Sequence, residues 1–274
     1  MSGPFGIPWH YKLKAEQVIT AQASAALEVS ELPQVSAVGS TQLADIRIGP
    51  TRLILVCIGS QIVWQPQTIS ALFNLYTDAD SLPDPWINEI PYNILDPTTW
   101  YTAGVTGGAM RFEMPQGLVG WPAIFSSRYR NSNQTFGDDG WIEIQVANAG
   151  SAPSYGNTFN TQVYRRYSND GSYDNGVGID LSVGEISIVT RVGGTETLQQ
   201  DCGPFVNGDV IRQTQAGNEF AVIVNGEQTG AWTDEGGITA SGPAERSVGI
   251  YVSGTKDFLG PRRFSPSLSY IEAV

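Results

Sequence analysis

The stretch GNEFAVIVNGEQTGAW, residues 217–232, decides the fold class of this chain. Apolar and polar residues alternate from Glu219 to Val224, an Asn225-Gly226 pair follows, and apolar residues return at Ala231 and Trp232. A two-residue turn that matches the twist of its strands needs positive φ at both positions, and Asn-Gly is the pair that forms it at least cost. The stretch therefore predicts a β-hairpin.

A further strand signal lies directly upstream of this hairpin. Asn207-Gly208 marks a turn, Val210 to Gln213 reads as a strand, and Gly217 allows the chain to reverse before the hairpin begins. We therefore expect three consecutive antiparallel strands. Trp86 and Trp232 are expected to close the two ends of the core against which these strands pack.

The chain after residue 70 carries similar signals at short intervals. Other β-prone segments separated by turn residues are, in order, GGAMRFEMP, GWPAIFSSRYR, GWIEIQVANAG, TQVYRRYS, GVGIDLSV, EISIVTRVGG, RSVGIYVSG and SPSLSYIEAV. About ten strands exceed a minimal immunoglobulin domain and suit two larger packed sheets. The sequence predicts an all-β, two-sheet antiparallel jelly-roll sandwich over residues 71–274.

Composition supports a β-rich chain and excludes several functions. Of the 274 residues only 15% are charged, while 31 Gly and 16 Pro make turns frequent. The net charge of −12 and the lack of any Lys/Arg run remove the attraction that nucleic-acid binding needs. No apolar run reaches about 18 residues, and the opening MSGPFGIPWHYKLK lacks the order of a secretory signal. We therefore expect synthesis in the cytoplasm and no membrane insertion.

Residues 1–70 lack the regular succession of strand and turn signals found in the rest of the chain. LADIRI and LILVCIGSQIVW predict strands, whereas the Pro-rich arm that ends near His10 predicts irregular backbone. A segment this small buries little by itself, so we expect it to dock on the following domain or on another chain. Leu53–Ile58 and Pro4–Trp9 are the candidate contacts with partner subunits.

Four stretches, taken in order and spacing, carry a family resemblance. They are FNLYTDADSLPDPW (Phe73–Trp86), Gly208–Arg212, Gly217–Gly226 and Arg246–Tyr251. Together they resemble the concanavalin A-like, or laminin-G-like, jelly roll that is appended to phage tail proteins. The chain as a whole resembles minor tail proteins of siphophages that infect actinobacteria such as mycobacteria.

The resemblance implies a virion protein of the tail tip, made in the cytoplasm of the host bacterium. Residues 1–70 would then be a mixed or extended segment for tail attachment and oligomerisation. Other tail-tip proteins would be its partners. The tail context, rather than any heptad repeat, favours a homo-oligomer and most simply a trimer.

Catalysis of glycoside hydrolysis would need two facing carboxylates about 5 to 5.5 Å apart for a retaining mechanism. Enzymes that share the resembled fold carry Glu-x-Asp-x-x-Glu on one strand, and this chain has no such run. Glu143 stands alone, and Asp180 and Glu185, at an odd spacing, are expected on opposite faces of one strand. The only histidine is His10, so no Ser-His-Asp arrangement is available. We therefore expect no enzyme and no catalytic residues.

Metal and redox sites have few candidates. The loop YSNDGSYDNG offers Asp170 and Asp174 as weak calcium ligands, and FGDDGW offers Asp138 and Asp139. The spacing misses the EF-hand pattern, and Asp, Asn and Gly are also the ordinary residues of tight turns, which is the reading we favour over a metal site. Cys57 and Cys202, the latter in a predicted loop, have no CxxC spacing, so two isolated thiols and no cofactor are expected.

Glycan binding needs an aromatic face and neighbouring hydrogen-bonding side chains, and two loop regions carry this mixture. The candidate glycan-binding residues are Tyr129, Arg130, Asn133, Asp138, Tyr155, Asn157, Arg165, Tyr167, Asn169 and Tyr173. The alternative is that these are ordinary turn and strand-surface residues.

The function predicted from sequence is therefore a phage minor tail protein whose jelly roll binds a host cell-envelope glycan during adsorption. One alternative is a purely architectural virion protein that binds no sugar. Another is a cell-wall glycoside hydrolase, which would release soluble sugar through Glu143 or Glu185.

Overall fold

The computed structural model describes residues 47–48, 51–52, 56–58, 61–64, 68–79, 81–90, 103–112, 124–152, 159–182, 184–256 and 261–274. The chain divides into two units, Met1–Gln67 and Thr68–Val274. The predicted arm Pro4–Trp9, His10, and the glycan candidates Tyr155 and Asn157 lie outside the described residues.

In the first unit the described residues form two short antiparallel strand pairs. Strand β1 (Arg47–Ile48) pairs antiparallel with β2 (Thr51–Arg52), and β3 (Val56–Ile58) pairs antiparallel with β4 (Gln61–Trp64). The two segments predicted as strands, LADIRI and LILVCIGSQIVW, contain β1, β3 and β4. Cys57 lies in β3.

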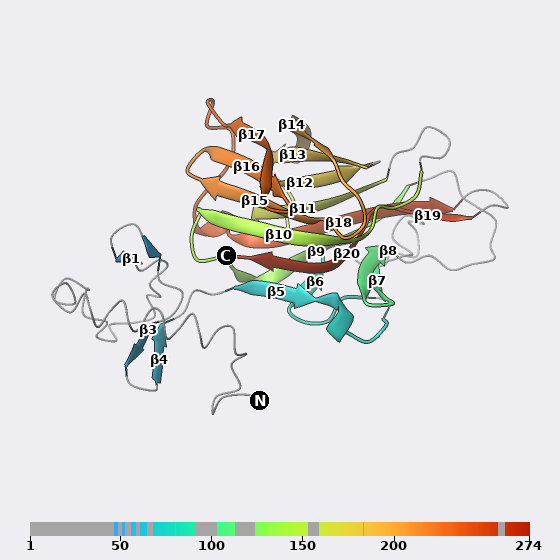
Figure 1. The fold of residues 1–274 in the computed structure, drawn as a ribbon, viewed down its shortest axis with the longest axis horizontal. Coiled ribbons are helices and arrows are strands. Elements are labelled where there is room, and N and C mark those ends of the chain that lie inside the picture. Colours follow the sequence, from blue (N-terminus) through green and yellow to red (C-terminus); the bar gives the residue numbers. More distant parts are fainter. Residues whose placement is uncertain are drawn as a thin grey trace. The chain divides into compact units, whose positions relative to one another are not determined.

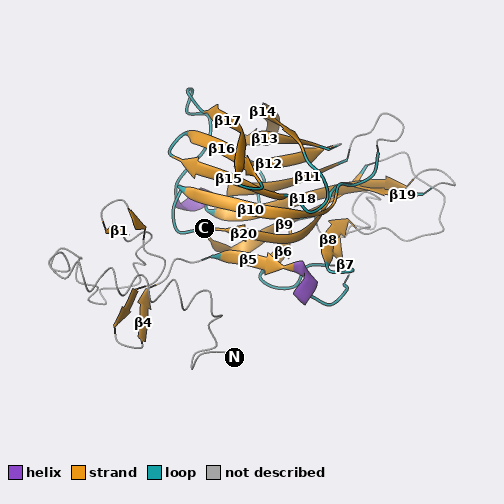
Figure 2. Ribbon diagram, viewed as in Figure 1, coloured by secondary structure: helices purple, strands orange, loops and turns teal. Residues whose placement is uncertain are grey.

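The second unit consists of two antiparallel sheets, as Figures 1 and 2 show. Sheet I has the order β17-β16-β15-β10-β20-β8-β7, with β5 also pairing with β20. Sheet II has the order β14-β13-β12-β11-β18-β9-β6, with β19 also pairing with β18. The predicted all-β, two-sheet antiparallel sandwich is confirmed.

The strands of sheet I are β5 (Ile69–Leu72), β7 (Ala103–Thr106), β8 (Ala109–Phe112), β10 (Gly140–Asn148), β15 (Val210–Ala216), β16 (Glu219–Val224), β17 (Glu227–Thr233) and β20 (Ser267–Ala273). Those of sheet II are β6 (Trp86–Asn88), β9 (Phe125–Gln134), β11 (Asn160–Tyr167), β12 (Gly176–Ser182), β13 (Glu185–Val192), β14 (Thr195–Pro204), β18 (Ser247–Lys256) and β19 (Arg262–Phe264). The 3-10 turns are η2 (Phe73–Leu75) and η4 (Pro243–Glu245). No helix in the described part of the chain is long and apolar enough to span a membrane.

The hairpin predicted from residues 217–232 is confirmed. Strands β16 and β17 pair with Val224 opposite Glu227, and the intervening Asn225 and Gly226 have φ of 51° and 90°. Strand β15 pairs with β16, so the three consecutive antiparallel strands are also present. The earlier Asn207-Gly208 turn joins strands of different sheets, because β14 belongs to sheet II and β15 to sheet I.

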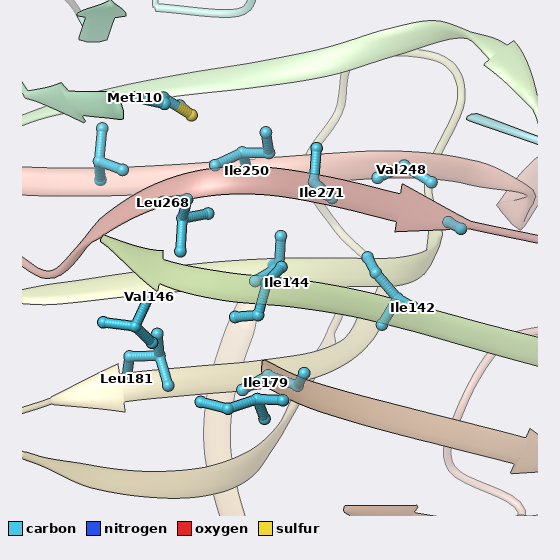
Figure 3. Packing of buried hydrophobic residues seen from close by; sticks show 14 of the residues in the cluster. Met110, Ile142, Ile144, Val146, Ile179, Leu181, Val248, Ile250, Leu268 and Ile271 are labelled. Atoms are coloured by element: carbon cyan, nitrogen blue, oxygen red, sulfur yellow. The ribbon is translucent and has the colours of Figure 1, made fainter. Parts of the chain in front are cut away.

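The core lies between the two sheets and is filled by alternate residues of their strands. Figure 3 shows core residues from β8, β10, β12, β18 and β20. Buried there are Ile142, Ile144 and Val146 of β10, Ile179 and Leu181 of β12, Val248 and Ile250 of β18, and Leu268 and Ile271 of β20. Each such side chain stabilises the fold by about 1.5–3 kcal/mol through removal from water.

Both tryptophans that were predicted to close the core pack against it. Trp86 is buried within the core, and Trp232 is half-buried and stacks on Phe220 with ring centroids 5.3 Å apart. Cys202 lies in β14 and is buried, which corrects its predicted place in a loop. Its thiol is free. An added Cβ on Gly230 of β17 would lie 2.3 Å from the Cys202 sulfur, so β14 and β17 approach closely there.

Candidate functional site

Strand β11 is buried on both of its faces, whereas a strand of an antiparallel sandwich commonly has one solvated face. Every residue from Thr161 to Tyr167 is buried. Val163 belongs to the core between the sheets, so side-chain alternation places Gln162 and Tyr164 on the opposite, outer face of sheet II. The outer face of sheet II therefore carries a second packed layer of side chains.

This layer is built from tyrosines and arginines. We call it the tyrosine–arginine cluster, and its members are Tyr164, Tyr167, Tyr173, Tyr251, Arg128 and Arg191. The ring centroids of Tyr164, Tyr167 and Tyr173 lie 5.6–6.1 Å apart, within the range of attractive aromatic pairs.

A β-bulge brings Tyr164 and Tyr167 to the same face of the sheet. In an unbroken strand, residues three positions apart point to opposite faces. The register of β11 against β18 shifts between these two tyrosines, and Arg166 between them has a positive φ of 54°. The extra residue restores Tyr167 to the outer face.

Glycines on the neighbouring strands make room for the two buried rings. A Cβ added to Gly176 of β12 would lie 2.8 Å from the Tyr164 ring, and one added to Gly249 of β18 would lie 2.7 Å from the Tyr167 ring. Any larger residue at either glycine would collide with an aromatic side chain. The cluster thus depends on residues that were not themselves recognisable as site residues.

Tyr173 reaches the cluster from the loop between β11 and β12. Its ring lies between two guanidinium groups, with Cζ of Arg128 at 3.8 Å and Cζ of Arg191 at 3.6 Å from the ring centroid. Arg191 also donates a hydrogen bond from Nε to the Tyr173 main-chain oxygen at 3.0 Å. Each cation–π contact contributes about 0.5–2 kcal/mol, which helps to hold Tyr173 at its positive φ of 60°.

Glu89 fixes the part of the cluster nearest to β6. Its carboxylate accepts hydrogen bonds from Tyr167 Oη at 2.6 Å and from Arg130 Nε at 2.7 Å, and it forms an ion pair with Arg128 Nε at 3.3 Å. The side chain is only 4% exposed, so its charge requires these partners. Burial and the hydrogen bond to Glu89 raise the pKa of Tyr167 far above its usual range.

A chain of side-chain hydrogen bonds crosses β11 and β12 beneath the rings. Tyr164 Oη donates to Gln162 Oε1 at 2.7 Å, and Gln162 Nε2 donates to Asp180 Oδ1 at 2.8 Å. Asn160 Nδ2 donates to the same oxygen at 2.8 Å. Burial raises the pKa of Asp180, and the two amide donors offset only part of that rise.

Three of the predicted glycan-binding residues are buried, so their side chains do not lie at the surface. Tyr129 is 1% exposed on the core side of β9, where its Oη donates to the Ala103 oxygen at 3.1 Å. Arg165, also 1% exposed, donates to the main-chain oxygens of Gly137, Asp138, Asp139 and Val274. Tyr167 is fully buried, so its ring offers no free face to a sugar.

The remaining candidates are distributed over two places. Arg130 and Tyr173 join Tyr167 around Glu89 and Arg128, although Tyr173 is only 7% exposed. Asp138 instead accepts hydrogen bonds from Arg246 Nε and the Gly242 amide, both at 3.0 Å. Asn133 is exposed, and half-buried Asn169 donates to the Pro243 oxygen at 3.1 Å.

The carboxylates weighed for hydrolysis lie on different faces of the sandwich. Glu143, on the outer face of sheet I, accepts from Arg212 Nε and Tyr270 Oη, both at 2.7 Å. Asp180 and Glu185 belong to the consecutive strands β12 and β13, which pair with Ser182 opposite Glu185. Alternation therefore places both on the outer face of sheet II, which corrects the expected opposite faces. Glu185 is exposed at the end of its strand.

The two calcium candidates occupy an ordinary turn. Asp170 Oδ1 accepts a hydrogen bond from the Ser172 amide at 2.9 Å, and Asp174 is exposed. Within the described residues, no three or more His, Cys, Asp or Glu side chains gather as a metal site would require.

Sequence reasoning did not select Arg128, Arg191, Gln162, Tyr164, Tyr251 or Glu89 for this site. The segment TQVYRRYS contains large or polar residues at both odd and even positions, and that pattern is the signal of a strand packed on two faces. Arg128 and Arg191 could not be found in this way, since strands β9 and β13 are separated in sheet II by β18, β11 and β12.

Comparison with known proteins places the chain in a family. Residues 103–266, more than half of the chain, match a family described as a domain of unknown function, DUF7257. The chain belongs to DUF7257. A comparison with curated protein sequences finds no match for this DUF7257 member.

Solved structures similar to this DUF7257 chain include three bacterial or metagenomic proteins. A β-1,3-1,4-glucanase (lichenase) derived from a mouse hindgut metagenome has a TM-score of 0.49 and 12% identity, covering 75% of this chain and 98% of that one. The β-glucanase of Bacillus licheniformis has a TM-score of 0.46 and 13% identity, covering 76% of this chain and 97% of that one. The carbohydrate-binding module CBM66 from Bacillus subtilis has a TM-score of 0.42 and 11% identity, covering 68% of this chain and 96% of that one.

Proposed function

We propose that this protein is a minor tail protein of a phage that infects actinobacteria, and that its jelly roll binds a glycan of the host envelope. The order of the four stretches between Phe73 and Tyr251 supports the tail assignment. In this proposal the protein is located at the tail tip of the virion, contacts other tail proteins there and assembles as a homo-oligomer. Several copies on one tip strengthen weak single-site binding, because linked sites raise the effective concentration.

The observation that carries the binding proposal is the fixed geometry of the tyrosine–arginine cluster. Stacked arginines and hydrogen bonds through Gln162 and Asp180 hold its side chains at defined positions on the outer face of sheet II. Packing between the two sheets does not require polar groups on that face. A buried polar network stabilises a fold only when all its members are satisfied, so an apolar layer would be the simpler way to cover this face. A preorganised polar surface, in contrast, lowers the ordering cost of binding a ligand.

Half-buried Tyr251 is the ring of the cluster that we assign to contact with sugar. It lies opposite Gln162 on β11 and opposite Arg128 on β9, so hydrogen-bonding side chains flank it on both sides. A ring with such neighbours suits the apolar side of a pyranose and its hydroxyl groups.

Binding is tested by sedimenting the purified protein with isolated actinobacterial cell walls. We expect the unmodified protein to sediment with the walls and Tyr251→Ala to lose about tenfold in affinity, equivalent to about 1.4 kcal/mol. Tyr270→Ala is the matched control, because Tyr270 is also half-buried but lies on sheet I and donates to Glu143. Equal losses in both variants, or no sedimentation of the unmodified protein, would contradict glycan binding through this face. A cryo-EM map of the particle tests the tail position.

In this proposal the protein makes and breaks no bond. Glu89 is engaged by two arginines and a tyrosine, and Asp180 by two amides, which supports a positioning role for these carboxylates. Soluble sugar released from walls, and lost in Asp180→Asn or Glu185→Gln, would overturn this part of the proposal.

A purely architectural role is the second candidate. It is favoured by the complete burial of Tyr164 and Tyr167, which leaves neither ring free for a sugar. This candidate predicts that the protein remains on the particle and that Tyr251→Ala has no effect on adsorption of the phage to its host.

A further inference from the structure

Arg128 and Arg130 form a pair on the outer face of sheet II. They lie two positions apart on β9, so their side chains point to the same face. Both guanidinium groups approach the one carboxylate of Glu89 through Nε, at 3.3 Å for Arg128 and 2.7 Å for Arg130. A Cβ added to Gly171 would lie 3.4 Å from Glu89 Oε1, so the β11–β12 loop also covers this carboxylate. Glu89 thus orients two arginines at once.

The outer nitrogens of this pair have no hydrogen-bond partner among the residues that the structure describes. Within that part of the chain no hydrogen bond joins an Nη atom of Arg128 or Arg130 to another residue, and the two side chains are 17% and 15% exposed. Arg191 differs, since its Nε, Nη1 and Nη2 contact the Tyr173 oxygen, Glu196 and the Gly194 oxygen. A guanidinium held through Nε presents two parallel N–H groups, which match the oxygens of a carboxylate or phosphate.

The local charge also suits an anion. Two guanidinium charges share the single buried carboxylate of Glu89, in a chain whose net charge is −12. Asp170 also lies near Arg130, but it is exposed to water and engaged with the Ser172 amide. Water screens an exposed charge of this kind strongly. Glu196, whose charge acts on Tyr251, is paired with Arg191.

The pair adjoins the ring assigned above to sugar contact. Arg128 lies directly opposite Tyr251 across β9 and β18, and Arg130 lies opposite Gly249. Side chains directly opposite on one face have Cβ atoms roughly 4.5–5.5 Å apart. A sugar ring on Tyr251 would therefore place a charged substituent within reach of the arginine nitrogens.

We infer that Arg128 and Arg130 bind an anionic group of the glycan, while Tyr251 contacts the sugar ring that carries it. The group is an oxyanion, either the carboxylate of an acidic sugar or a phosphodiester between sugars. This inference rests on the proposed function, because it names the class of glycan that the outer face of sheet II recognises.

The experiment compares isolated actinobacterial cell walls before and after two treatments. Reduction of activated carboxyl groups to alcohols removes sugar carboxylates, and treatment with hydrofluoric acid removes phosphodiesters. We expect one treatment to lower the affinity of the unmodified protein at least tenfold, and to identify the source of the anion. Unchanged affinity after both treatments would overturn the inference and leave glycan binding itself standing. No binding to untreated walls would instead refute the proposed function.

Variants test the assignment to this pair. Arg130→Gln and Arg128→Gln are each expected to lose about tenfold in affinity for untreated walls, because each variant removes charge-assisted hydrogen bonds to the anion. Arg130→Lys keeps the charge without the paired N–H groups and is expected to lose most of the same affinity. The Arg130→Lys variant still tests the assignment if Arg128→Gln disturbs folding.

Arg212→Gln is the matched control for these variants. Arg212 also pairs with a carboxylate, Glu143 at 2.6 Å, and also stacks on an aromatic ring, Trp141 at 4.5 Å, but on the outer face of sheet I. It is expected to bind walls like the unmodified protein. Retention of full affinity by Arg130→Gln, or an equal loss in Arg212→Gln, would show that the pair does not receive the anion.

Discussion

Arg165 precedes Val274 by 109 positions, yet its Nε donates a hydrogen bond to the Val274 main-chain oxygen at 2.9 Å. Its other nitrogens donate to the main-chain oxygens of residues 137–139. A side chain first selected as a glycan ligand thus joins β11, the loop before β10 and the residue after β20. Its burial makes it a structural residue.

Replacement of Arg165 by Met is expected to lower the free energy of unfolding by about 3 kcal/mol or more. Several buried carbonyl groups would lose their donor, and each such group costs about 1–3 kcal/mol. Urea unfolding followed by tryptophan fluorescence measures the change. Arg212→Met is the control, because the Arg212 side chain is 40% exposed, and its ion pair is expected to contribute no more than about 1 kcal/mol. Equal stability of the two variants would contradict the structural role.

Substitution of Gly178 by Ala is expected to cost about 3 kcal/mol, because over-packing of this kind cannot be relieved by a rotamer change. The new Cβ would lie 1.9 Å from the main-chain oxygen of Val163 on the neighbouring strand. Gly236→Ala serves as the control: its Cβ would lie 3.4 Å from Ile238 Cγ2, an ordinary contact, and a change within about 1 kcal/mol is expected. Thermal unfolding of both variants under the same conditions decides the comparison.

Asp180→Asn is expected to make the protein more stable at neutral pH. The pKa of Asp180 is raised by burial above its ordinary 3.8, so the folded state holds this proton more tightly than the unfolded state. The wild-type protein therefore loses stability from this group as the pH rises through the folded-state pKa. The advantage of the variant should shrink below pH about 4. Urea unfolding of both proteins across pH 3–8 measures this difference. A variant that is less stable than the wild type at every pH would contradict the prediction.

Asp138→Asn should show the opposite dependence. Burial tends to raise the pKa of Asp138, but hydrogen bonds from Arg246 and the Gly242 amide outweigh it and place the pKa below 3.8. The ionised group therefore contributes stability above pH about 4, and this contribution is lost as the pH falls through the folded-state pKa. The variant should be less stable than the wild type at pH 7, with the difference narrowing in acid. An unchanged difference between pH 7 and pH 3 would argue against an ionic origin.

The Cys202 thiol is expected to resist alkylation while the protein is folded. Burial raises its pKa to about 11, and the side chain is 2% exposed, so little thiolate forms at pH 8 and little reagent reaches it. Iodoacetamide labelling of a Cys57→Ser variant isolates this thiol. Labelling in urea, but not in buffer, is the expected result, and fast labelling of the folded protein would contradict it.

Local patterns predicted the hairpin, the strand succession and the sandwich. Asn225-Gly226 specifies its own turn, and alternation along β10 identifies Ile142, Ile144 and Val146 as core residues without knowledge of their partners. These features depend on neighbouring residues, so they can be read from a single sequence.

The site was predicted only in part, because it depends on pairings between distant strands. Arg130, Tyr167 and Tyr173 were selected as polar and aromatic residues, but Arg128 and Arg191 meet Tyr173 only through the strand order of sheet II. The bulge at Arg166 reverses the side-chain direction that simple alternation assigns to Tyr167. Asp180 and Glu185 were misplaced for a related reason, since a turn separates two strands that were taken as one.

Two contacts restrict which substitutions the tyrosines and their neighbouring strands can accept. Gly176 lies against the Tyr164 ring, and Gly249 lies against the Tyr167 ring. Enlarging a glycine first creates a collision, and shrinking a tyrosine first leaves a void, so either single step passes through a less stable protein. Changing both positions of a pair together avoids the less stable intermediate. Descendants of this protein should therefore inherit the pairs intact or lose both members.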